Sequence, residues 1–335
     1  MVSSSASTAR PRVGFLGVGW IGRNRMEAIG AEGMVDIAAV ADPSREMADA
    51  AAALAPGAAI VADFDALLDL GLDGIVIATP SALHAAQSIR ALERGAAVFC
   101  QKPLGRTEEE VAAVLDAARA ADRLLAVDLS YRWTGGMRRI RDLVRAGELG
   151  RVFAVDLVFH NAYGPDKAWF RDPALSGGGC VMDLGVHLVD LALWVLGFPD
   201  LRDVRATLLA GGEPLGPRPD RVEDYAVATL EAEGGPVIRL ACSWHLPAGR
   251  DAAISAAFYG TAGGAEFRNL DGSFYDFTAE RFRGTGRETL SGPPDPWGGR
   301  AAADWARRLA SGVRFDPDAE RLRVVARALD RIYGR

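Results

Sequence analysis

Three ionisable side chains stand in an otherwise apolar stretch near the middle of the chain, SGGGCVMDLGVHLVDLALWVLG at 176–197. Asp183 and His187 are four residues apart, so a helix would place them on one face, one turn from each other. Asp190 follows three residues after His187. Buried charges need a partner or a task. A histidine can take the proton of a hydroxyl group while a nearby aspartate orients its ring, which predicts acid–base catalysis.

Two other interpretations of this cluster stay open. Asp183, His187 and Asp190 could bind a metal ion together, because carboxylates and imidazoles are both metal ligands. Alternatively, Asp183 and His187 could be a satisfied buried pair with a structural role only. Asp190 could simply cap or orient the group. We favour acid–base catalysis and expect no metal, because other parts of the chain predict a redox cofactor.

Lysine is rare in this sequence: of 38 basic residues only Lys102 and Lys167 are lysine. An ammonium is a compact, rotatable donor that can also release a proton when its pKa is lowered, which a guanidinium cannot do. Lys102 lies in Gln101-Lys102-Pro103, directly after a short apolar run. There it could hydrogen-bond a substrate oxygen that gains charge. The alternative is that the two lysines are ordinary surface residues left by chance.

A glycine-rich turn lies near the N-terminus, in VGFLGVGWIG at 13–22. An apolar run followed by three spaced glycines predicts a strand, a tight turn and a helix whose first amides hold a dinucleotide pyrophosphate. This spacing is weak evidence alone, because it also arises by chance in glycine-rich turns. The residues expected to contact the cofactor here are Gly17, Val18, Gly19, Trp20, Ile21 and Gly22.

An aspartate follows the second apolar run, at 36–41. Asp42 lies twenty residues past Gly22, where a carboxylate can accept hydrogen bonds from ribose hydroxyls. This favours NAD, because a carboxylate repels the 2′-phosphate of NADP. Arg45 stands close by and could accommodate that phosphate, so NADP remains the alternative. Asp42 could also do no more than begin a turn with Pro43.

From residue 11 to about 130, short apolar runs alternate with helical patterns, which predicts a doubly wound parallel sheet of the Rossmann type. The expected strands are 36–41, 74–78, 96–100 and 124–128, and the expected helices are 46–54, 81–94 and 107–121. Ligands bind beyond the carboxyl ends of such strands. The residues expected to line one crevice there are Thr79, Pro80, His84, Gln101 and Lys102. His84 could equally be a satisfied histidine in the first helical turn.

After residue 130 the pattern changes to alternating strands with glycine-containing breaks, which predicts a largely antiparallel sheet. The expected strands are 151–160, 222–231, 237–244, 252–259, 265–268 and 274–277, with helices at 136–145, 301–310 and 317–333 and a mobile or contact-making loop at 284–299. Ser81 is expected to cap the helix at 81–94, and Thr107 with Glu110 to form a capping box. We divide the chain into a flexible tail (1–10), a dinucleotide-binding domain (11–130) and an α+β substrate domain (131–335).

A long irregular segment at 161–179 carries aromatic and charged side chains together. Tyr163, Lys167 and Trp169 offer stacking faces and hydroxyl-binding groups, which would suit a sugar or cyclic polyol with apolar C–H faces and a fringe of hydroxyls. We therefore place them among the substrate-binding residues. The alternative is that the aromatic side chains only cover the sheet edge.

Composition limits the function classes. A net charge of −6 and a pI near 5.4 argue against general nucleic-acid binding. No apolar run is expected to reach membrane-spanning length, and residues 1–11 lack a signal-peptide hydrophobic region, so no membrane partner is expected. Three distant cysteines, at 100, 180 and 242, indicate neither a disulfide framework nor a zinc site. A cytoplasmic location is expected.

Taken in order, these motifs resemble the Gfo/Idh/MocA oxidoreductase family, which includes inositol dehydrogenases and glucose-fructose oxidoreductase. The resemblance covers nearly the whole chain. It rests on Gly17-Val18-Gly19-Trp20-Ile21-Gly22, Thr79-Pro80 with His84, Gln101-Lys102-Pro103, Tyr131-Arg132-Trp133 and Asp183-Leu184-Gly185-Val186-His187. It implies an N-terminal Rossmann domain, tightly held NAD(P), and a catalytic set of Lys102, Asp183 and His187. It also implies a C-terminal open sheet that makes oligomer contacts, and so a homodimer or homotetramer.

One departure from the family is plain, since Gln101 stands where the family usually has glutamate before the lysine-proline pair. The lysine itself is retained. We place Tyr131 and Arg132 with Lys102, Asp183 and His187 on the substrate side. The expected activity is NAD(P)-dependent hydride transfer at a secondary alcohol or ketone of a sugar or inositol-like polyol. The alternatives are a glycoside-cleaving enzyme that oxidises its substrate transiently and a dinucleotide-binding regulator without turnover.

Overall fold

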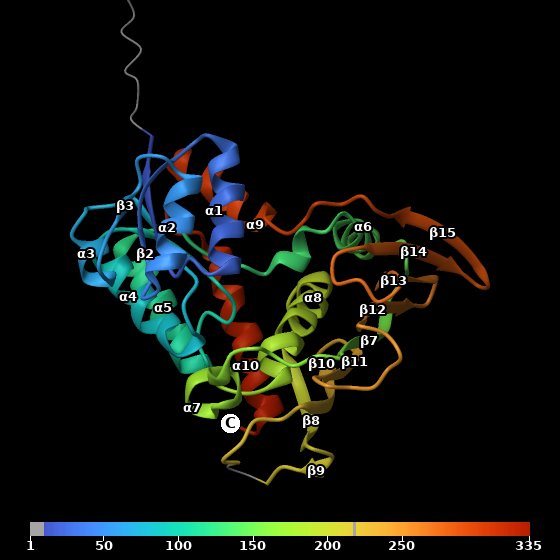
Figure 1. The fold of residues 1–335 in the computed structure, drawn as a ribbon. Coiled ribbons are helices and arrows are strands. Elements are labelled where there is room, and N and C mark those ends of the chain that lie inside the picture. Colours follow the sequence, from blue (N-terminus) through green and yellow to red (C-terminus); the bar gives the residue numbers. More distant parts are fainter. Residues whose placement is uncertain (1–9, 217–218) are drawn as a thin grey trace, which may run out of the picture.

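The computed structural model describes residues 10–216 and 219–335. Two α/β domains lie side by side (Figure 1). The first contains a six-stranded sheet in the order β3-β2-β1-β4-β5-β6, and every neighbouring pair is parallel. This is the strand order of a dinucleotide-binding fold, so the expected Rossmann architecture is confirmed. The strands are β1 (Arg12–Leu16), β2 (Asp36–Ala41), β3 (Ala59–Ile60), β4 (Gly74–Ile77), β5 (Ala97–Cys100) and β6 (Leu125–Val127).

Helices cover both faces of this sheet, which explains why its central strands are apolar along their whole length. All residues of β4 and β5 are buried. Each strand and helix expected between 36 and 128 is present to within one residue at either end. The helices are α1 (Trp20–Glu32), α2 (Arg45–Leu54), α3 (Phe64–Leu68), α4 (Ser81–Glu93) and α5 (Glu108–Ala121).

The helix caps of this domain follow the sequence in one case and differ in another. The Thr107 hydroxyl accepts a hydrogen bond from the Glu110 amide at 3.2 Å, so Thr107 caps α5 as expected. The other half of the expected capping box differs, because the Glu110 carboxylate accepts from the Arg106 amide at 2.7 Å. The prediction that Ser81 caps α4 is wrong, because Pro80 is the N-cap and no side chain caps this helix. Ser81 is already the first helical residue. The first amides of α4 therefore lack a side-chain cap.

The second domain is built on a nine-stranded sheet in the order β15-β14-β13-β12-β7-β11-β10-β8-β9. Only β7 and β11 pair in parallel, so the expected mostly antiparallel sheet is confirmed. The strands are β7 (Val152–Asn161), β8 (Leu201–Ala210), β9 (Glu213–Pro214), β10 (Tyr225–Ala232), β11 (Val237–Ser243), β12 (Ala252–Gly260), β13 (Gly263–Asn269), β14 (Phe277–Arg283) and β15 (Gly286–Ser291).

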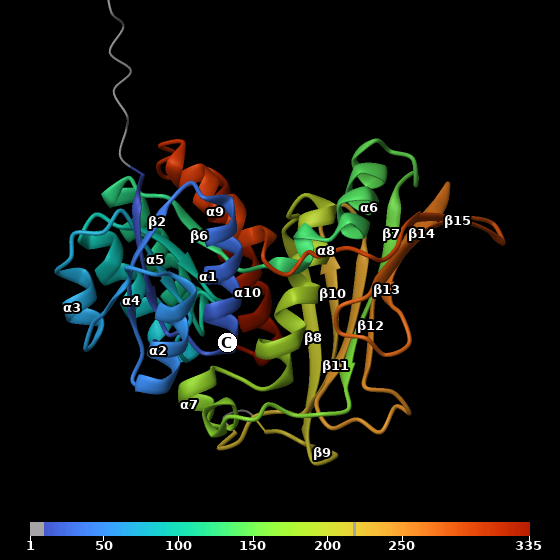
Figure 2. The same cartoon turned by 45° about the horizontal axis from the view of Figure 1, so that its top comes forward.

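One face of this sheet is covered and the other is open (Figure 2). The covered face packs on α6 (Gly135–Arg145) and α8 (Val186–Leu196), whose buried side chains share one core with alternate residues of the strands. In β10, for example, Ala226, Ala228 and Leu230 are buried while the residues between them face outward. Strict alternation of this kind is what made most of these strands predictable.

Three sequence expectations in this domain are wrong. The stretch 274–276 is a turn, because the Ser273 hydroxyl accepts from the amides of Tyr275 and Asp276 at 3.1 and 3.0 Å. The expected loop at 284–299 contains β15, whose residues are largely exposed and so show no apolar alternation. β8 was missed for the same reason, since only its last residue is fully buried.

The C-terminal helices return to the first domain. Residues of α9 (Arg300–Ala310), which the sequence division assigns to the second domain, lie in the core formed by α1 and the parallel sheet. Trp305 is fully buried there, with its ring centroid 5.9 Å from that of Phe99. After a 3-10 turn, η4 (Pro317–Glu320), α10 (Arg321–Tyr333) packs on α5 of the first domain and on α8 and β8 of the second. The two domains are therefore joined by more than one crossing of the chain.

One helical run, Pro173–Leu196, is long and apolar enough to cross a membrane by length and composition alone. It combines α7 (Pro173–Ser176), a π-helical turn, η3 (Val181–Gly185), and α8. The expectation that no apolar run reaches this length is therefore wrong. Most of the run is buried inside the protein, which is also typical of a core helix.

Candidate active site

The glycine-rich turn between β1 and α1 forms a backbone cradle. Gly17 has a φ of 80°, and a Cβ there would lie 2.6 Å from the carbonyl oxygen of Ala78. A Cβ on Gly22 would overlap the carbonyl oxygen of Gly17. Gly19, in contrast, has room for a Cβ, with the Lys167 ammonium 3.9 Å from that position, and it is the N-cap of α1, with no side chain capping the helix. Free amides at a helix N-terminus beside a cleared surface fit the pyrophosphate of a dinucleotide.

Asp42 closes this cradle from the end of β2. Its carboxylate accepts from the amides of Val18 and Ser44, both at 2.8 Å. It therefore ties the glycine-rich turn to the start of α2, and the predicted contact with ribose would use its remaining lone pairs. Arg45 lies beyond it, exposed, with its Nε 2.9 Å from Asp49.

The first turn of α4 is organised by His84. Its Nδ1 lies 2.6 Å from the Pro103 carbonyl oxygen and its Nε2 lies 2.7 Å from that of Thr79. Burial lowers the pKa of His84, with a smaller contribution from Lys102 in the same direction. Both ring nitrogens are thus occupied by main chain. His84 clamps the Thr79-Pro80 turn to the segment that carries Lys102, and this position matches the satisfied-histidine alternative.

Lys102 follows β5 and bonds across to the second domain. Its Nζ donates to the Asp183 main-chain oxygen at 2.6 Å and to Asp183 Oδ1 at 2.8 Å. Trp244 Nε1 donates to the other carboxylate oxygen at 3.1 Å. Both partners of the ion pair are mostly buried, with 19% and 18% of their side chains exposed. The sequence placed Lys102 and Asp183 in one catalytic set, with Asp183 beside His187, but it predicted neither their direct contact nor the contribution of Trp244.

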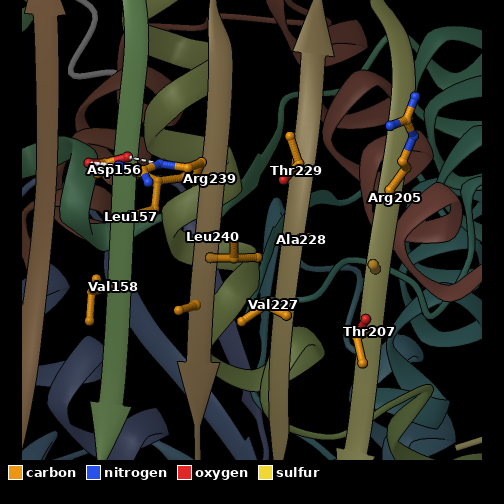
Figure 3. Close-up of a pocket in the computed structure, with 12 residues that line it drawn as sticks. Asp156, Leu157, Val158, Arg205, Thr207, Val227, Ala228, Thr229, Arg239 and Leu240 are labelled. Carbon is orange, nitrogen blue, oxygen red and sulfur yellow. Dashed lines mark hydrogen bonds and ion pairs between the residues drawn. The ribbon is translucent and has the colours of Figure 1, made fainter. Parts of the chain in front are cut away.

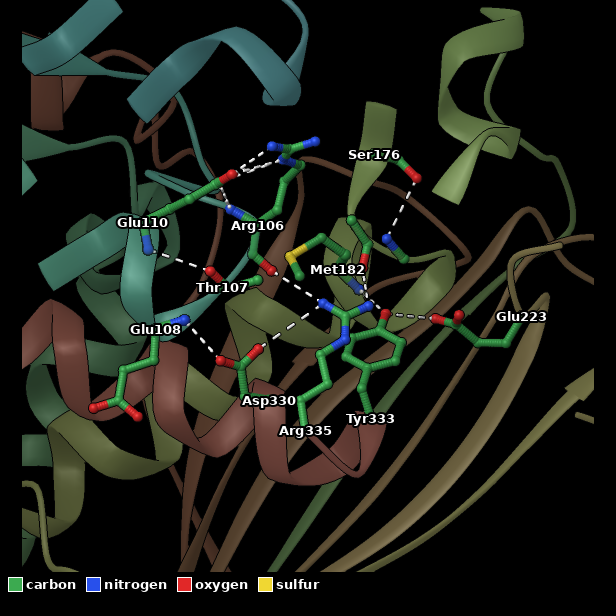
Figure 4. A network of polar contacts seen from close by, with 12 residues as sticks. Arg106, Thr107, Glu108, Glu110, Ser176, Met182, Glu223, Asp330, Tyr333 and Arg335 are labelled. Atoms are coloured by element: carbon green, nitrogen blue, oxygen red, sulfur yellow. Dashed lines mark hydrogen bonds and ion pairs between the residues drawn. The ribbon is translucent and has the colours of Figure 1, made fainter. Parts of the chain in front are cut away.

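The glycine triplet at 177–179 positions the segment that carries Asp183. A Cβ on Gly179 would overlap the main chain of Glu223, and one on Gly178 would overlap the Tyr333 hydroxyl. The buried Glu223 carboxylate accepts from the amides of Gly179 and Val181, both at 2.9 Å, and from the Tyr333 hydroxyl at 2.8 Å. Figure 4 shows the hydrogen bond from the Tyr333 hydroxyl to the Glu223 carboxylate. The triplet is needed for close approach, and Glu223 fixes the amides that precede Asp183.

His187 lies in the first turn of α8, after the π-helical turn, and is partly buried. Its ring centroid is 4.9 Å from that of Tyr131. Burial lowers the pKa of His187 well below its usual range, and Lys102 and Arg25 lower it further. Its Nδ1 is buried without a partner among the residues described. An unpaired buried nitrogen is unusual and typical of functional sites, and a neutral imidazole can accept a proton.

The hydrogen bond expected between Asp183 and His187 does not form in the described part of the chain. Both carboxylate oxygens of Asp183 are already engaged, by Lys102 and by Trp244. Asp183 therefore orients Lys102 in this structure.

Asp190 and Arg132 form a separate, buried pair. Arg132 donates two hydrogen bonds to the Asp190 carboxylate, one at 2.7 Å, and its guanidinium lies over the ring of Phe198. Burial raises the pKa of Asp190, and Arg132 opposes this shift. Because Arg132 and Asp190 bond to each other, the structure does not bring Arg132 to the Lys102–Asp183 pair. Within residues 10–216 and 219–335, no group of three His, Cys, Asp or Glu side chains is arranged to hold a metal.

The segment at 161–179 is less irregular than expected, since it contains η2 (Ala168–Arg171) and α7. Trp169 stacks on Phe170 with centroids 3.8 Å apart, and Phe170 meets the edge of Trp244, the residue that holds Asp183. Tyr163 is exposed and donates to Asp251 at 2.6 Å. Aromatic side chains of this segment thus do reach the neighbourhood of Asp183, although Tyr163 is held elsewhere.

Gln101 takes part in a buried polar cluster beside Lys102. Its amide donates to Asp128 Oδ2 at 2.7 Å, and Arg25 donates to the same oxygen. The other oxygen of Asp128 is buried without a partner in the part of the chain that the structure describes. A carboxylate is therefore present next to Gln101, although it comes from the end of β6. Asp128 and Arg25 were not predicted from the sequence, because no local motif identifies them.

Comparison with known proteins agrees with this geometry. Residues 11–129 match a family model described as an oxidoreductase family with an NAD-binding Rossmann fold, and residues 137–266 match the GFO/IDH/MocA C-terminal domain. The chain is 29% identical over 274 residues to D-glucoside 3-dehydrogenase of Escherichia coli strain K12, covering 78% of each protein. It is 29% identical over 322 residues to levoglucosan dehydrogenase of Pseudarthrobacter phenanthrenivorans, covering 85% of this chain and 81% of that protein.

Solved structures show the same fold. A levoglucosan dehydrogenase in complex with NADH and levoglucosan superposes with a TM-score of 0.82 at 24% identity, and 96% of each chain is covered. With family models matching both domains, and with the glycine-rich turn, Lys102, Asp183 and His187 arranged as described, the chain belongs to the Gfo/Idh/MocA family of NAD-binding oxidoreductases.

Proposed function

We propose that this protein is an NAD-dependent dehydrogenase that moves a hydride between the nicotinamide and a secondary alcohol or ketone of a sugar or cyclic polyol. The observation that carries the proposal is the contact of Lys102 with Asp183 beside His187. Lys102 follows a central strand of the Rossmann sheet, so it lies beyond the carboxyl ends of the strands, where ligands of such sheets bind.

The chemistry that the chain contributes follows from these side chains. When bound, the dinucleotide supplies the hydride acceptor for the substrate carbon. Lys102, held by Asp183, donates a hydrogen bond to the substrate oxygen as that oxygen gains negative charge. His187 accepts the hydroxyl proton, because burial keeps its imidazole neutral. In the reverse direction His187 returns this proton to the oxygen of the ketone.

Asp42 supports NAD over NADP as the cofactor. It stands beside the glycine-rich turn and is held there by two main-chain amides, so its negative charge is fixed in place. A levoglucosan dehydrogenase of the same fold is solved with NADH, and a 3-ketoreductase, KijD10, with NADP. The fold itself therefore accepts either dinucleotide, and Asp42 at the end of β2 favours NAD.

The substrate class is supported by the aromatic wall and by the relatives. Trp169 and Phe170 provide stacked rings next to Trp244 and Asp183, and such rings suit the apolar faces of a sugar. Relatives named for inositol, D-glucoside and levoglucosan oxidation share between 27% and 30% identity with this chain. Polyols and sugars with a free secondary hydroxyl are the compounds to test first.

The test is a cofactor and substrate assay. The dinucleotide released from freshly purified protein is identified by mass, and then inositols, glucosides and anhydrosugars are screened for absorbance at 340 nm with NAD and NADP. We expect reduction of NAD by at least one member of this panel. A folded protein that binds NAD but reduces neither cofactor with any compound would contradict the proposal.

We also propose that the protein forms a homodimer or homotetramer through the open face of the nine-stranded sheet. Exposed apolar residues, Val227, Val237 and Tyr259, lie on this face among charged side chains of both signs. Asp156, Arg239, Thr229 and Arg205 form one row across four neighbouring strands, and Figure 3 shows the Asp156–Arg239 ion pair in this row. A patch that carries both positive and negative side chains can pair with the same patch of a second copy across a two-fold axis.

Light scattering after size-exclusion chromatography tests the oligomer. The wild-type protein should have a multiple of the monomer mass, and Val227→Arg should lower that mass while leaving circular dichroism unchanged. A wild-type monomer at micromolar concentration would contradict this assignment.

A further inference from the structure

The second lysine of the chain, Lys167, lies over the glycine-rich turn. Its Nζ is 3.9 Å from the position that a Cβ of Gly19 would occupy. Lys167 belongs to the second domain, whereas Gly19 is the N-cap of α1 in the first. The ammonium therefore crosses between the domains at the place where the cradle is open.

The backbone of Lys167 is held by its neighbours. The Lys167 main-chain oxygen accepts from the Phe170 amide at 3.2 Å, which closes the 3-10 turn η2. Trp169 and Phe170 stack on each other, and Phe170 packs on the edge of Trp244 in the second domain. The lysine stem extends from this anchored turn, so the position of its ammonium above Gly19 depends on packed elements.

The charges at this place do not balance. No carboxylate lies within 4.0 Å of Lys167 Nζ in residues 10–216 and 219–335, and the side chain is exposed. The group it faces is the N-terminus of α1, which is the positive end of a helix and has neither a capping side chain nor an acidic residue in its first turn. Asp42, the carboxylate at this turn, already accepts from the amides of Val18 and Ser44. An anion between Lys167 and the N-terminus of α1 would be attracted by both positive groups.

We propose that Lys167 binds the pyrophosphate of the cofactor from the side opposite the α1 amides. The inference rests on the proposed function, because it takes the dinucleotide as the anion. It moves Lys167 from the substrate, where sequence analysis placed it, to the phosphates. Lys167 and Lys102 then act on the two ends of one cofactor site, at the phosphates and at the reacting carbon.

A lysine suits this position better than an arginine. The ammonium is a compact charge on a flexible stem, and it can reach a single phosphate oxygen without a flat surface opposite it. The bound pyrophosphate would also link the two domains, since α1 holds it from one domain and Lys167 from the other. Loss of the ammonium should therefore speed cofactor release more than it slows cofactor binding.

The experiment measures the dissociation constants of NADH and ADP-ribose for the wild-type protein and three variants, at low and high salt. Lys167→Met removes the charge and keeps most of the stem, and Lys167→Arg restores a charge. Arg94→Ala is the matched control, because it removes one exposed cation of the first domain that pairs with Asp69 at 3.4 Å. Arg94 lies at the far end of α4 from Thr79.

We expect Lys167→Met to raise the dissociation constants of NADH and ADP-ribose by the same factor of about ten at low salt, and by less at high salt. Lys167→Arg should lie within about threefold of the wild type, and Arg94→Ala within about twofold. The KM for the sugar at saturating cofactor should not change, and the apo melting curve should be that of the wild type.

Two results would overturn this inference and leave the proposed function standing. Equal affinities of the wild type and Lys167→Met for both ligands would show that the lysine does not contact the phosphates. Unchanged ADP-ribose affinity together with a raised sugar KM would return Lys167 to the substrate. A wild-type protein that binds neither NADH nor ADP-ribose would overturn the proposed function and this inference together.

Discussion

The two sides of the cofactor site are built by different means. On the side of the first domain, the glycine-rich turn offers main-chain amides and a cleared surface at Gly19. Where the second domain meets this side, the groups are side chains that hold one another, as Lys102 of the first domain and Trp244 of the second both bond to Asp183. The difference separates two tasks, because main chain can bind a phosphate of any dinucleotide while positioned side chains decide which bond reacts.

The largest effect is expected from substitutions of the side chains that carry out the reaction. Lys102→Ala and His187→Ala should each lower kcat by about a thousandfold, because each removes a group that interacts with the reacting oxygen or its proton. NADH affinity should stay within about threefold, since the α1 amides are untouched. Steady-state kinetics and fluorescence titration measure the two quantities. Turnover within tenfold of the wild type would contradict the catalytic roles assigned to Lys102 and His187.

A pair of glycine substitutions sharpens the comparison. Gly179→Ala should destabilise the protein by about 3 kcal/mol, because its methyl group overlaps the main chain of Glu223. Gly19→Ala should change stability by less than about 0.5 kcal/mol, since a Cβ there meets only the end of the Lys167 side chain at an ordinary contact distance of 3.9 Å, but it should weaken NADH binding by about tenfold. Urea unfolding without cofactor and NADH titration separate the two effects. Equal losses of stability in both variants would contradict the distinction.

A smaller effect concerns Trp244, which acts through Asp183. Trp244→Phe keeps an aromatic ring against Phe170 but removes the donor to Asp183 Oδ2. We expect kcat to fall about fivefold and NADH affinity to be unchanged, because Asp183 would hold Lys102 less firmly. Kinetics at saturating NAD measure this change. An unaltered kcat would remove Trp244 from the positioning of Lys102.

The smallest effect is a displacement of the pH profile. Burial lowers the pKa of His187, so the neutral imidazole, which is the form that accepts a proton, persists below the ordinary histidine pKa of about 6.5. The kcat/KM for alcohol oxidation should stay constant as pH falls through 6.5 and decrease only at more acidic values. An acid limb centred at or above pH 6.5 would show that His187 is not neutral as described.

The first domain could be predicted almost entirely from sequence, and the second only in part. In the first, β4 and β5 are continuous apolar runs, and Gly17, Gly19 and Gly22 follow one another within six residues. The short elements β3 and α3 have too few residues to show a pattern and were not predicted. The support of Asp183 comes from Trp244 and Glu223, which lie 61 and 40 positions further along the chain. No periodicity links such residues. The sequence offered one signal for Trp244, its position directly after the end of β11.

The roles of Asp183 and Lys167 show the same limit. Their spacing or type suggested a partner for each, His187 for Asp183 and the substrate for Lys167. The structure places Lys102 and Trp244 on Asp183 instead, and Gly19 below Lys167. Helical spacing can put two residues on one face, but it does not determine which third group bonds first.

The central claim is that a hydride leaves a secondary carbinol carbon for the cofactor at the Lys102 and His187 pair. The most direct measurement uses an accepted sugar or polyol labelled with deuterium at that carbon and mass spectrometry of the NADH formed. We expect one deuterium per NADH with the wild-type protein and no labelled NADH above background with Lys102→Ala. Unlabelled NADH, or glycoside cleavage without any NADH, would contradict it.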